Sequence, residues 1–139
     1  MPFNEGVYFI SLTCYNWLAL FDIADAYTDL YKQFDCLTTE GHFIVGYVIM
    51  PNHIHLLIAF RKTDKGINKR IGTMKRFLAY KLVDRLQKAE RVDILHILAN
   101  GVNNTDKKTG KLHAVFEPSF DKKECYTTDF LLQKLDYIH

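Results

Sequence analysis

The stretch Tyr47–Ile58, which reads Tyr-Val-Ile-Met-Pro-Asn-His-Ile-His-Leu-Leu-Ile, decides how this chain folds. An apolar run ends at Pro51-Asn52, and a second apolar run that carries two histidines follows directly. Proline and asparagine are turn residues, so the two runs are predicted to form an antiparallel hairpin. The predicted strands are Phe43–Met50 and His53–Phe60.

The two histidines of this hairpin, His53 and His55, are two residues apart. Successive side chains on a strand point to opposite faces, so we expect both rings on the same face. Two imidazoles about 7 Å apart along a strand can converge on one metal ion or one phosphate. A histidine in a strand is also commonly structural, because a buried polar ring needs a hydrogen-bond partner. Spacing alone leaves both roles open.

The segment Met50-Pro-Asn-His-Ile-His-Leu-Leu resembles the histidine–hydrophobe–histidine (HUH) signature of the single-tyrosine transposases, especially the REP-associated tyrosine transposases. The resemblance extends over nearly the whole chain, as far as Tyr137-Ile-His at the C-terminus. It implies an endonuclease and strand transferase that nicks and rejoins single-stranded, hairpin-marked DNA. It also implies that His53 and His55 hold a divalent metal ion, Mg²⁺ or Mn²⁺.

Length and composition predict one globular domain. The chain has 139 residues, 48% of them apolar and 14% aromatic, which suffices to bury a core. Its three cysteines, Cys14, Cys36 and Cys125, are odd in number and are interpreted as reduced thiols. No apolar stretch approaches the ~20 residues that span a bilayer, and no export signal is visible. We therefore expect a cytoplasmic protein that is associated with the nucleoid through DNA.

Periodicity and turn residues predict an α+β protein with a ferredoxin-like (RRM-like) fold, an antiparallel sheet with helices packed on one face. The segment Asn100–Lys111 is interpreted as a surface insertion, with a binding loop or a hairpin tip as alternatives. Besides the hairpin, the predicted elements are strand Val7–Cys14, a helix from an N-cap at Asp22 to about Thr38 with Gly41 as its stop, a helix from about Gly66 to Glu90, a short helix Val92–Ala99, a short strand near Ala114–Phe116, and a last helix from an N-cap at Thr127 or Thr128.

The second long helix concentrates positive charge. Between Arg61 and Arg91 there are eleven Lys or Arg and three Asp or Glu, a net charge of +8 in a chain whose total is +2. Acidic partners are nearly absent from the helix itself, so the basic side chains are interpreted as an unpaired surface beside the histidines. Such a surface favours a phosphate backbone as its ligand, although most charged helices are simply solvated. The candidate DNA-binding residues are Lys69, Arg70, Lys75, Arg76 and Lys81.

The nucleophile is assigned from the resemblance, because composition does not choose among eight tyrosines. Leu135-Asp136-Tyr137-Ile-His is similar to the family segment that carries the catalytic tyrosine, and Tyr137 is the matching residue. Attack of its phenolate on DNA would conserve the bond energy in a 5′-phosphotyrosine link. The family places an Asn or Gln metal ligand four residues after the tyrosine. That position lies beyond His139, so we expect a single catalytic domain, residues 1–139, that is truncated at its C-terminus, with loss of this ligand in the natural protein as the alternative.

Two other functions remain open. One is a catalytically degenerate module that binds single-stranded nucleic acid, because a ferredoxin-like sheet with exposed aromatic residues also suits base stacking. The other is a metalloprotein unrelated to nucleic acid. A homodimer is also compatible with the resemblance, which allows the tyrosine helix to complete its own subunit's site or a partner's. The remaining histidines, His42, His96 and His113, are expected to be dispensable for metal binding.

Overall fold

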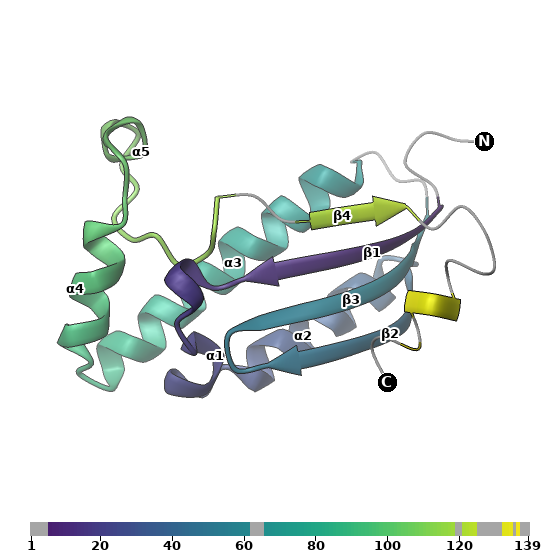
Figure 1. Cartoon of the computed structure of the whole chain (residues 1–139), viewed down its shortest axis with the longest axis horizontal. Coiled ribbons are helices and arrows are strands. Elements are labelled where there is room, and N and C mark those ends of the chain that lie inside the picture. Colours follow the sequence, from purple (N-terminus) through teal and green to yellow (C-terminus); the bar gives the residue numbers. More distant parts are fainter. Residues whose placement is uncertain (1–5, 62–65, 119–120, 125–131, 135, 137–139) are drawn as a thin grey trace.

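A single four-stranded sheet forms the centre of the molecule in the computed structural model, which describes residues 6–61, 66–118, 121–124, 132–134 and 136 (Figure 1). The strand order is β2-β3-β1-β4, and every neighbouring pair is antiparallel. The predicted hairpin is confirmed at both ends of both strands. The bounds are β1 Gly6–Thr13, β2 Phe43–Met50, β3 His53–Phe60 and β4 Asp121–Glu124.

Two long helices, α2 (Tyr27–Thr39) and α3 (Ile67–Lys88), cover one face of this sheet (Figure 1). With the strands they give the order strand, helix, strand, strand, helix, strand, which confirms the predicted α+β ferredoxin-like arrangement. The core lies between the helices and the sheet, where apolar side chains from alternate strand positions meet the apolar stripe of α3. Its buried members include Ile10, Leu12, Ile54, Leu56, Ile58, Ile67, Ile71, Met74, Leu78, Leu82 and Leu86. Phe77, on the same helix, is 44% exposed.

The first long helix begins later than predicted. Asp22 belongs to a separate short helix, α1 (Leu20–Ile23), and Asp25 then adopts a left-handed φ of 51° that interrupts the helical path. The helical end was predicted correctly. Gly41 has a φ of 100°, which glycine adopts without steric cost, and its N–H donates to the carbonyl of Thr38.

The strand predicted near Ala114–Phe116 is wrong. Within the described residues, this segment contributes one isolated bridge, between Phe116 and Cys14, and the fourth strand is β4 further along the chain. The segment is nevertheless buried, with Val115 and Phe116 in the core, and its backbone bonds to helical and turn residues. The N–H of Ala114 donates to the carbonyl of Leu98, and the carbonyl of Val115 accepts from the N–H of Tyr15.

The segment interpreted as a surface insertion continues helical structure. Helix α4 (Val92–Asn100) ends at Gly101, and α5 (Asn104–Lys108) follows, so the hairpin-tip alternative is wrong. Gly101 is required by a close approach, because a β-carbon there would lie 2.5 Å from Cζ of Tyr15. Residues 132–134 and 136 are helical, whereas the predicted N-cap of the last helix falls outside the described residues. Among the helices described, none is both long and apolar enough to cross a membrane.

Candidate functional site

His53 and His55 lie together on the sheet face that points away from α2 and α3. Ile54, between them, is fully buried in the core beneath the helices. The centroids of the two imidazole rings are 4.9 Å apart, and their planes are inclined at 72°. The predicted common face is therefore confirmed, and both rings are partly exposed.

Each imidazole is oriented by a hydrogen bond at Nδ1. Nδ1 of His53 lies 2.8 Å from Oδ1 of Asn52, an oxygen that can only accept, so this nitrogen carries the proton. The neutral ring then presents the lone pair of Nε2. Nδ1 of His55 lies 2.7 Å from Oγ of Ser11, a hydroxyl that can donate or accept, so this contact orients the ring in either tautomer. Hydrogen bonds of this kind hold metal-ligating histidines in place in many proteins.

The surroundings favour the neutral form of both rings. Burial lowers the pKa of His53 below its usual value. Burial likewise lowers the pKa of His55, and the nearby His53 and Lys134 lower it further. The ring of Phe9 stacks on His55 at a centroid distance of 5.2 Å. Neutral imidazole is the form that ligates a metal ion.

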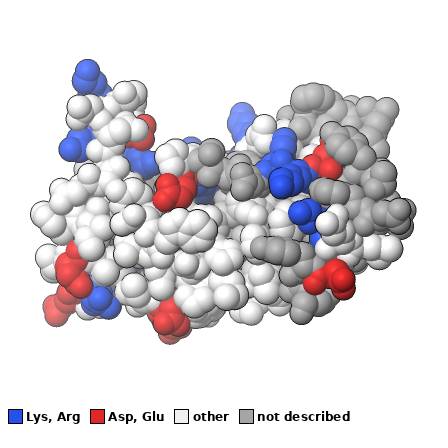
Figure 2. Space-filling model, viewed as in Figure 1, with Lys and Arg blue, Asp and Glu red and all other residues white. Residues whose placement is uncertain are grey.

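The C-terminal part of the chain returns to this same face. Nζ of Lys134, within the helical residues 132–134, lies 4.8 Å from the centroid of the Phe9 ring. Lys123 pairs with Phe9 across β1 and β4 and is exposed. On this face, Figure 2 shows basic side chains near β4. Tyr137, the candidate nucleophile, lies outside the described residues, three positions after Lys134.

Helix α3 does not lie beside the histidines, as the charge pattern had suggested, but on the opposite side of the sheet (Figure 1). Two of its three arginines, Arg70 and Arg85, are also paired with acidic side chains. Nε and Nη2 of Arg70 donate to the carboxylate of Glu40 at 2.7 and 2.9 Å, and Nε of Arg85 donates to Asp29 at 2.6 Å. Both acids come from α2 or its C-terminal end. The spacing of charges within α3 alone therefore does not reveal these ion pairs. Arg70 is buried in this ion pair.

The other candidate cations of α3 reach the surface. Lys69, Arg76 and Lys81 are exposed, and Nζ of Lys81 lies 5.6 Å from the ring centroid of Phe77. Lys75 is half-buried, and its Nζ donates to the carbonyl of Glu117 at 2.6 Å. Burial lowers the pKa of Lys75, and the nearby Lys111 lowers it further.

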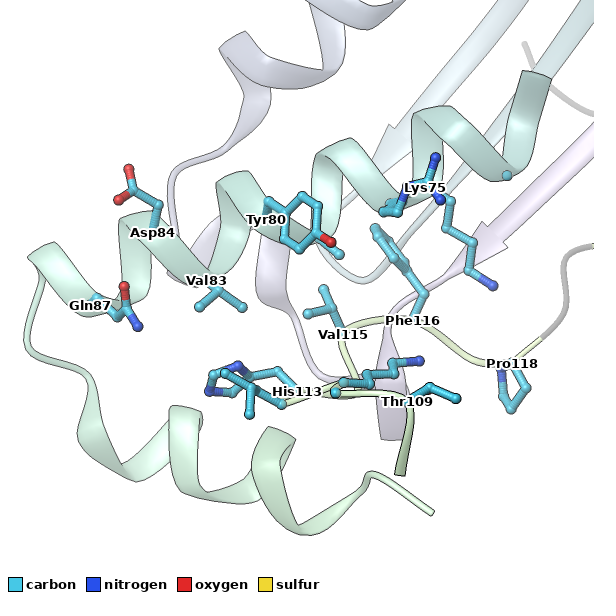
Figure 3. Close-up of a pocket in the computed structure, with 16 residues that line it drawn as sticks. Lys75, Tyr80, Val83, Asp84, Gln87, Thr109, His113, Val115, Phe116 and Pro118 are labelled. Atoms are coloured by element: carbon cyan, nitrogen blue, oxygen red, sulfur yellow. The ribbon is translucent and has the colours of Figure 1, made fainter. Parts of the chain in front are cut away.

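Lys75 and Arg76 line a groove of about 930 Å³ between α3 and the segment 109–118 (Figure 3). Lys111 and His113 come from the other wall, and Tyr80 stands at the surface of α3, 70% exposed. The groove thus combines three cations with an exposed aromatic ring, which suits a phosphate backbone. The charge pattern of the sequence indicated Lys75 and Arg76 but not the residues across the groove, because residues 109–118 lie against α3 only in the folded chain.

The remaining histidines are held elsewhere. His42 is buried, stacks on Phe60 at a centroid distance of 4.1 Å, and accepts from the N–H of Arg61. His96 lies on α4, and His113 lines the groove of Figure 3. Within the part of the chain that the structure describes, no group of three or more His, Cys, Asp or Glu side chains gathers as metal ligands.

Comparisons with known proteins support the fold. No protein-family profile matches the chain, and no curated protein is significantly similar to it. Among solved structures, the fold is similar to a REP-associated tyrosine transposase bound to a REP hairpin, with a TM-score of 0.58 and 15% identity over 99% of this chain and 67% of that one. It is also similar to a candidate transposase from Deinococcus radiodurans, with a TM-score of 0.56 and 16% identity over 96% of this chain and 88% of that one. The chain therefore has the fold of the tyrosine transposases.

Proposed function

We propose that this protein is a metal-dependent endonuclease and strand transferase that acts on single-stranded, hairpin-marked DNA. The observation that carries the proposal is the pair of imidazoles on the sheet face away from the helices, each oriented through Nδ1 by Asn52 or Ser11. The transposase fold and the hairpin bound to one of its structural neighbours support the same conclusion.

His53 and His55 would supply two ligands to a divalent ion through Nε2. The fit rests on the chemistry of this pair, because two imidazoles on one face of a strand, each oriented through Nδ1, form a donor set that divalent ions accept. A bound Mg²⁺ or Mn²⁺ supplies charge neutralisation and polarisation of the scissile phosphate. The exposed position on the sheet allows an extended DNA strand to lie against both rings.

Tyr137 would be the nucleophile. Its phenolate oxygen attacks the phosphorus, the bond from phosphorus to the 3′-oxygen breaks, and the departing 3′-oxygen takes a proton. The resulting 5′-phosphotyrosine keeps one phosphoester bond, so attack by a 3′-hydroxyl can restore the strand. The support from the described residues is that Lys134, three positions earlier in the sequence, lies over the ring of Phe9 beside His55.

The DNA backbone would also contact the exposed cations of α3. Lys69, Arg76 and Lys81 are exposed there, and Lys75 with Arg76 lines the groove of Figure 3. Because α3 and the histidines lie on opposite sides of the sheet, the helix would anchor DNA at a distance from the cleaved phosphate. Arg70 is left out of this surface, since its guanidinium is engaged by Glu40.

The test is incubation with a single-stranded hairpin oligonucleotide and Mg²⁺ or Mn²⁺, followed by a denaturing gel. We expect a cleaved strand and a covalent protein–DNA adduct, both abolished by Tyr137→Phe with DNA binding retained. His53→Ala should abolish cleavage, whereas His96→Ala, on exposed α4, should leave it unchanged. An adduct that persists in Tyr137→Phe would assign the chemistry to another tyrosine.

A second function, binding of single-stranded nucleic acid without cleavage, is favoured by one observation. Aromatic rings flank both histidines, since Phe9 stacks on His55 and Trp17 meets His53 edge-on. Salt-sensitive DNA binding without adduct formation in any divalent metal would select this function over the nuclease.

A further inference from the structure

Trp17, the single tryptophan of the chain, is held in an unusual conformation at the edge of the histidine site. It ends the short 3-10 turn η1 (Tyr15–Trp17), directly after β1, and its side chain is 64% exposed. Asn16 and Trp17 have φ values of 54° and 56°. Left-handed backbone is uncommon outside glycine, and for a bulky residue such as tryptophan it carries strain. Two such residues in succession therefore require support from the rest of the fold.

The supporting contacts come from the backbone of η1 rather than from the indole. The N–H of Trp17 donates to the carbonyl of Cys14 at 3.1 Å, and the N–H of Asn16 donates to Oε1 of Glu117 at 2.9 Å. The N–H of Tyr15 donates to the carbonyl of Val115 at 2.8 Å. Exposure of a large aromatic ring forgoes the stabilisation that burial would provide. The fold thus maintains a strained turn that keeps an indole in solvent.

The indole stands next to one of the candidate metal ligands. Thr13, the last residue of β1, pairs with His53 in the sheet, so the turn that follows β1 emerges beside this histidine. The ring centroids of Trp17 and His53 are 6.2 Å apart, with the planes inclined at 69°. This edge-on contact uses one side of the indole and leaves much of its surface open to solvent.

We propose that Trp17 is a stacking platform for a nucleobase of single-stranded DNA whose phosphate lies at His53 and His55. The inference rests on the proposed function and adds a base-binding subsite to it. Every base has an aromatic face, so stacking holds a strand without reading its sequence. In a duplex those faces are covered by neighbouring base pairs. The platform therefore favours single-stranded over double-stranded DNA at the cleavage site.

The single tryptophan makes the contact directly measurable. Titration of the metal-free protein with a short single-stranded oligonucleotide should quench Trp17 fluorescence to saturation, with the same Kd as fluorescence anisotropy of labelled DNA. An oligonucleotide of equal length with abasic sites should bind through its phosphates and leave the fluorescence unchanged. Binding of the normal oligonucleotide without quenching overturns the proposal, and so does the absence of any binding.

Substitutions give an independent measurement. Stacking is worth about 1–3 kcal/mol per base, so Trp17→Ala should weaken single-strand affinity roughly 5- to 150-fold. Trp17→Phe should restore part of the loss, and Tyr31→Ala, an exposed aromatic change on α2, should have no effect. Equal affinities of Trp17→Ala and the parent protein overturn the platform. Adduct formation separates the two proposals. Quenching of Trp17 without a covalent adduct would contradict the nuclease activity and leave the stacking platform supported. An adduct without quenching would contradict the stacking platform and leave the nuclease activity supported.

Discussion

Replacing Arg85 with Met should destabilise the fold, although Arg85 belongs to a basic helix that looks like a DNA-binding surface. The change keeps the aliphatic stem and removes the guanidinium that donates to Asp29 at 2.6 Å. The side chain of Asp29 is only 6% exposed, so its carboxylate would be left in a poorly solvated site. Breaking a buried ion pair costs about 3–5 kcal/mol.

Two features of the site reduce that cost. Arg85 is 35% exposed, so water already screens the pair in part. Asp29 lies in the first turn of α2, where the helix dipole stabilises a negative charge by about 0.3–1 kcal/mol. We therefore expect a loss of about 2–3 kcal/mol in the free energy of unfolding, measured by urea denaturation. Thermal unfolding should show a Tm lower by roughly 6–12 °C.

The matched control is Lys88→Met on the last turn of the same helix. Lys88 forms a solvent-exposed pair with Asp84, and such pairs contribute about 0.3–0.5 kcal/mol. The salt dependence of DNA affinity should be nearly unchanged in Arg85→Met, whereas Lys81→Met should flatten it by roughly one unit. Equal stability of Arg85→Met and the parent protein would refute the reasoning that α2 supplies structural partners to α3.

Four further predictions concern stability and metal binding. Gly101→Ala should lower the free energy of unfolding by about 1–2 kcal/mol, because its β-carbon would displace a packed tyrosine ring. Gly72→Ala should raise the free energy of unfolding by up to about 1 kcal/mol, since a β-carbon there would meet no atom outside its own helix within 4 Å. If urea denaturation shows Gly101→Ala to be more stable than Gly72→Ala, both predictions are contradicted. Burial lowers the pKa of His42 from 6.5, so the unfolded state binds more protons than the folded state. The free energy of unfolding should therefore fall as the pH drops through 6.5. In urea denaturation from pH 7.5 to 5, His42→Leu should make this pH dependence weaker. Ser11→Ala should weaken Mn²⁺ binding by about 10- to 100-fold in calorimetry, and an unchanged Kd would show that Ser11 does not orient His55.

Local sequence was sufficient for features that depend on neighbouring residues. Pro51 and Asn52 set the hairpin turn, and alternation then placed His53 and His55 on one face, as the structure confirms. Gly41 ended α2 because a left-handed position favours glycine. The start of α2 was missed because Asp22 is a good capping residue in isolation, whereas the chain uses it in a separate short helix.

By itself, the sequence determined the strands of the hairpin, the α3 helix and the histidine pair, since periodicity and turn chemistry act over a few residues. Only the tertiary structure decided that α3 lies across the sheet from the histidines, that Arg70 and Arg85 pair with acids of another element, and that Ser11 meets His55. Those contacts join residues 30 to 56 positions apart. Their partners are chosen by strand register and by how helices pack on a sheet, and neither is expressed in the spacing of residues along one segment.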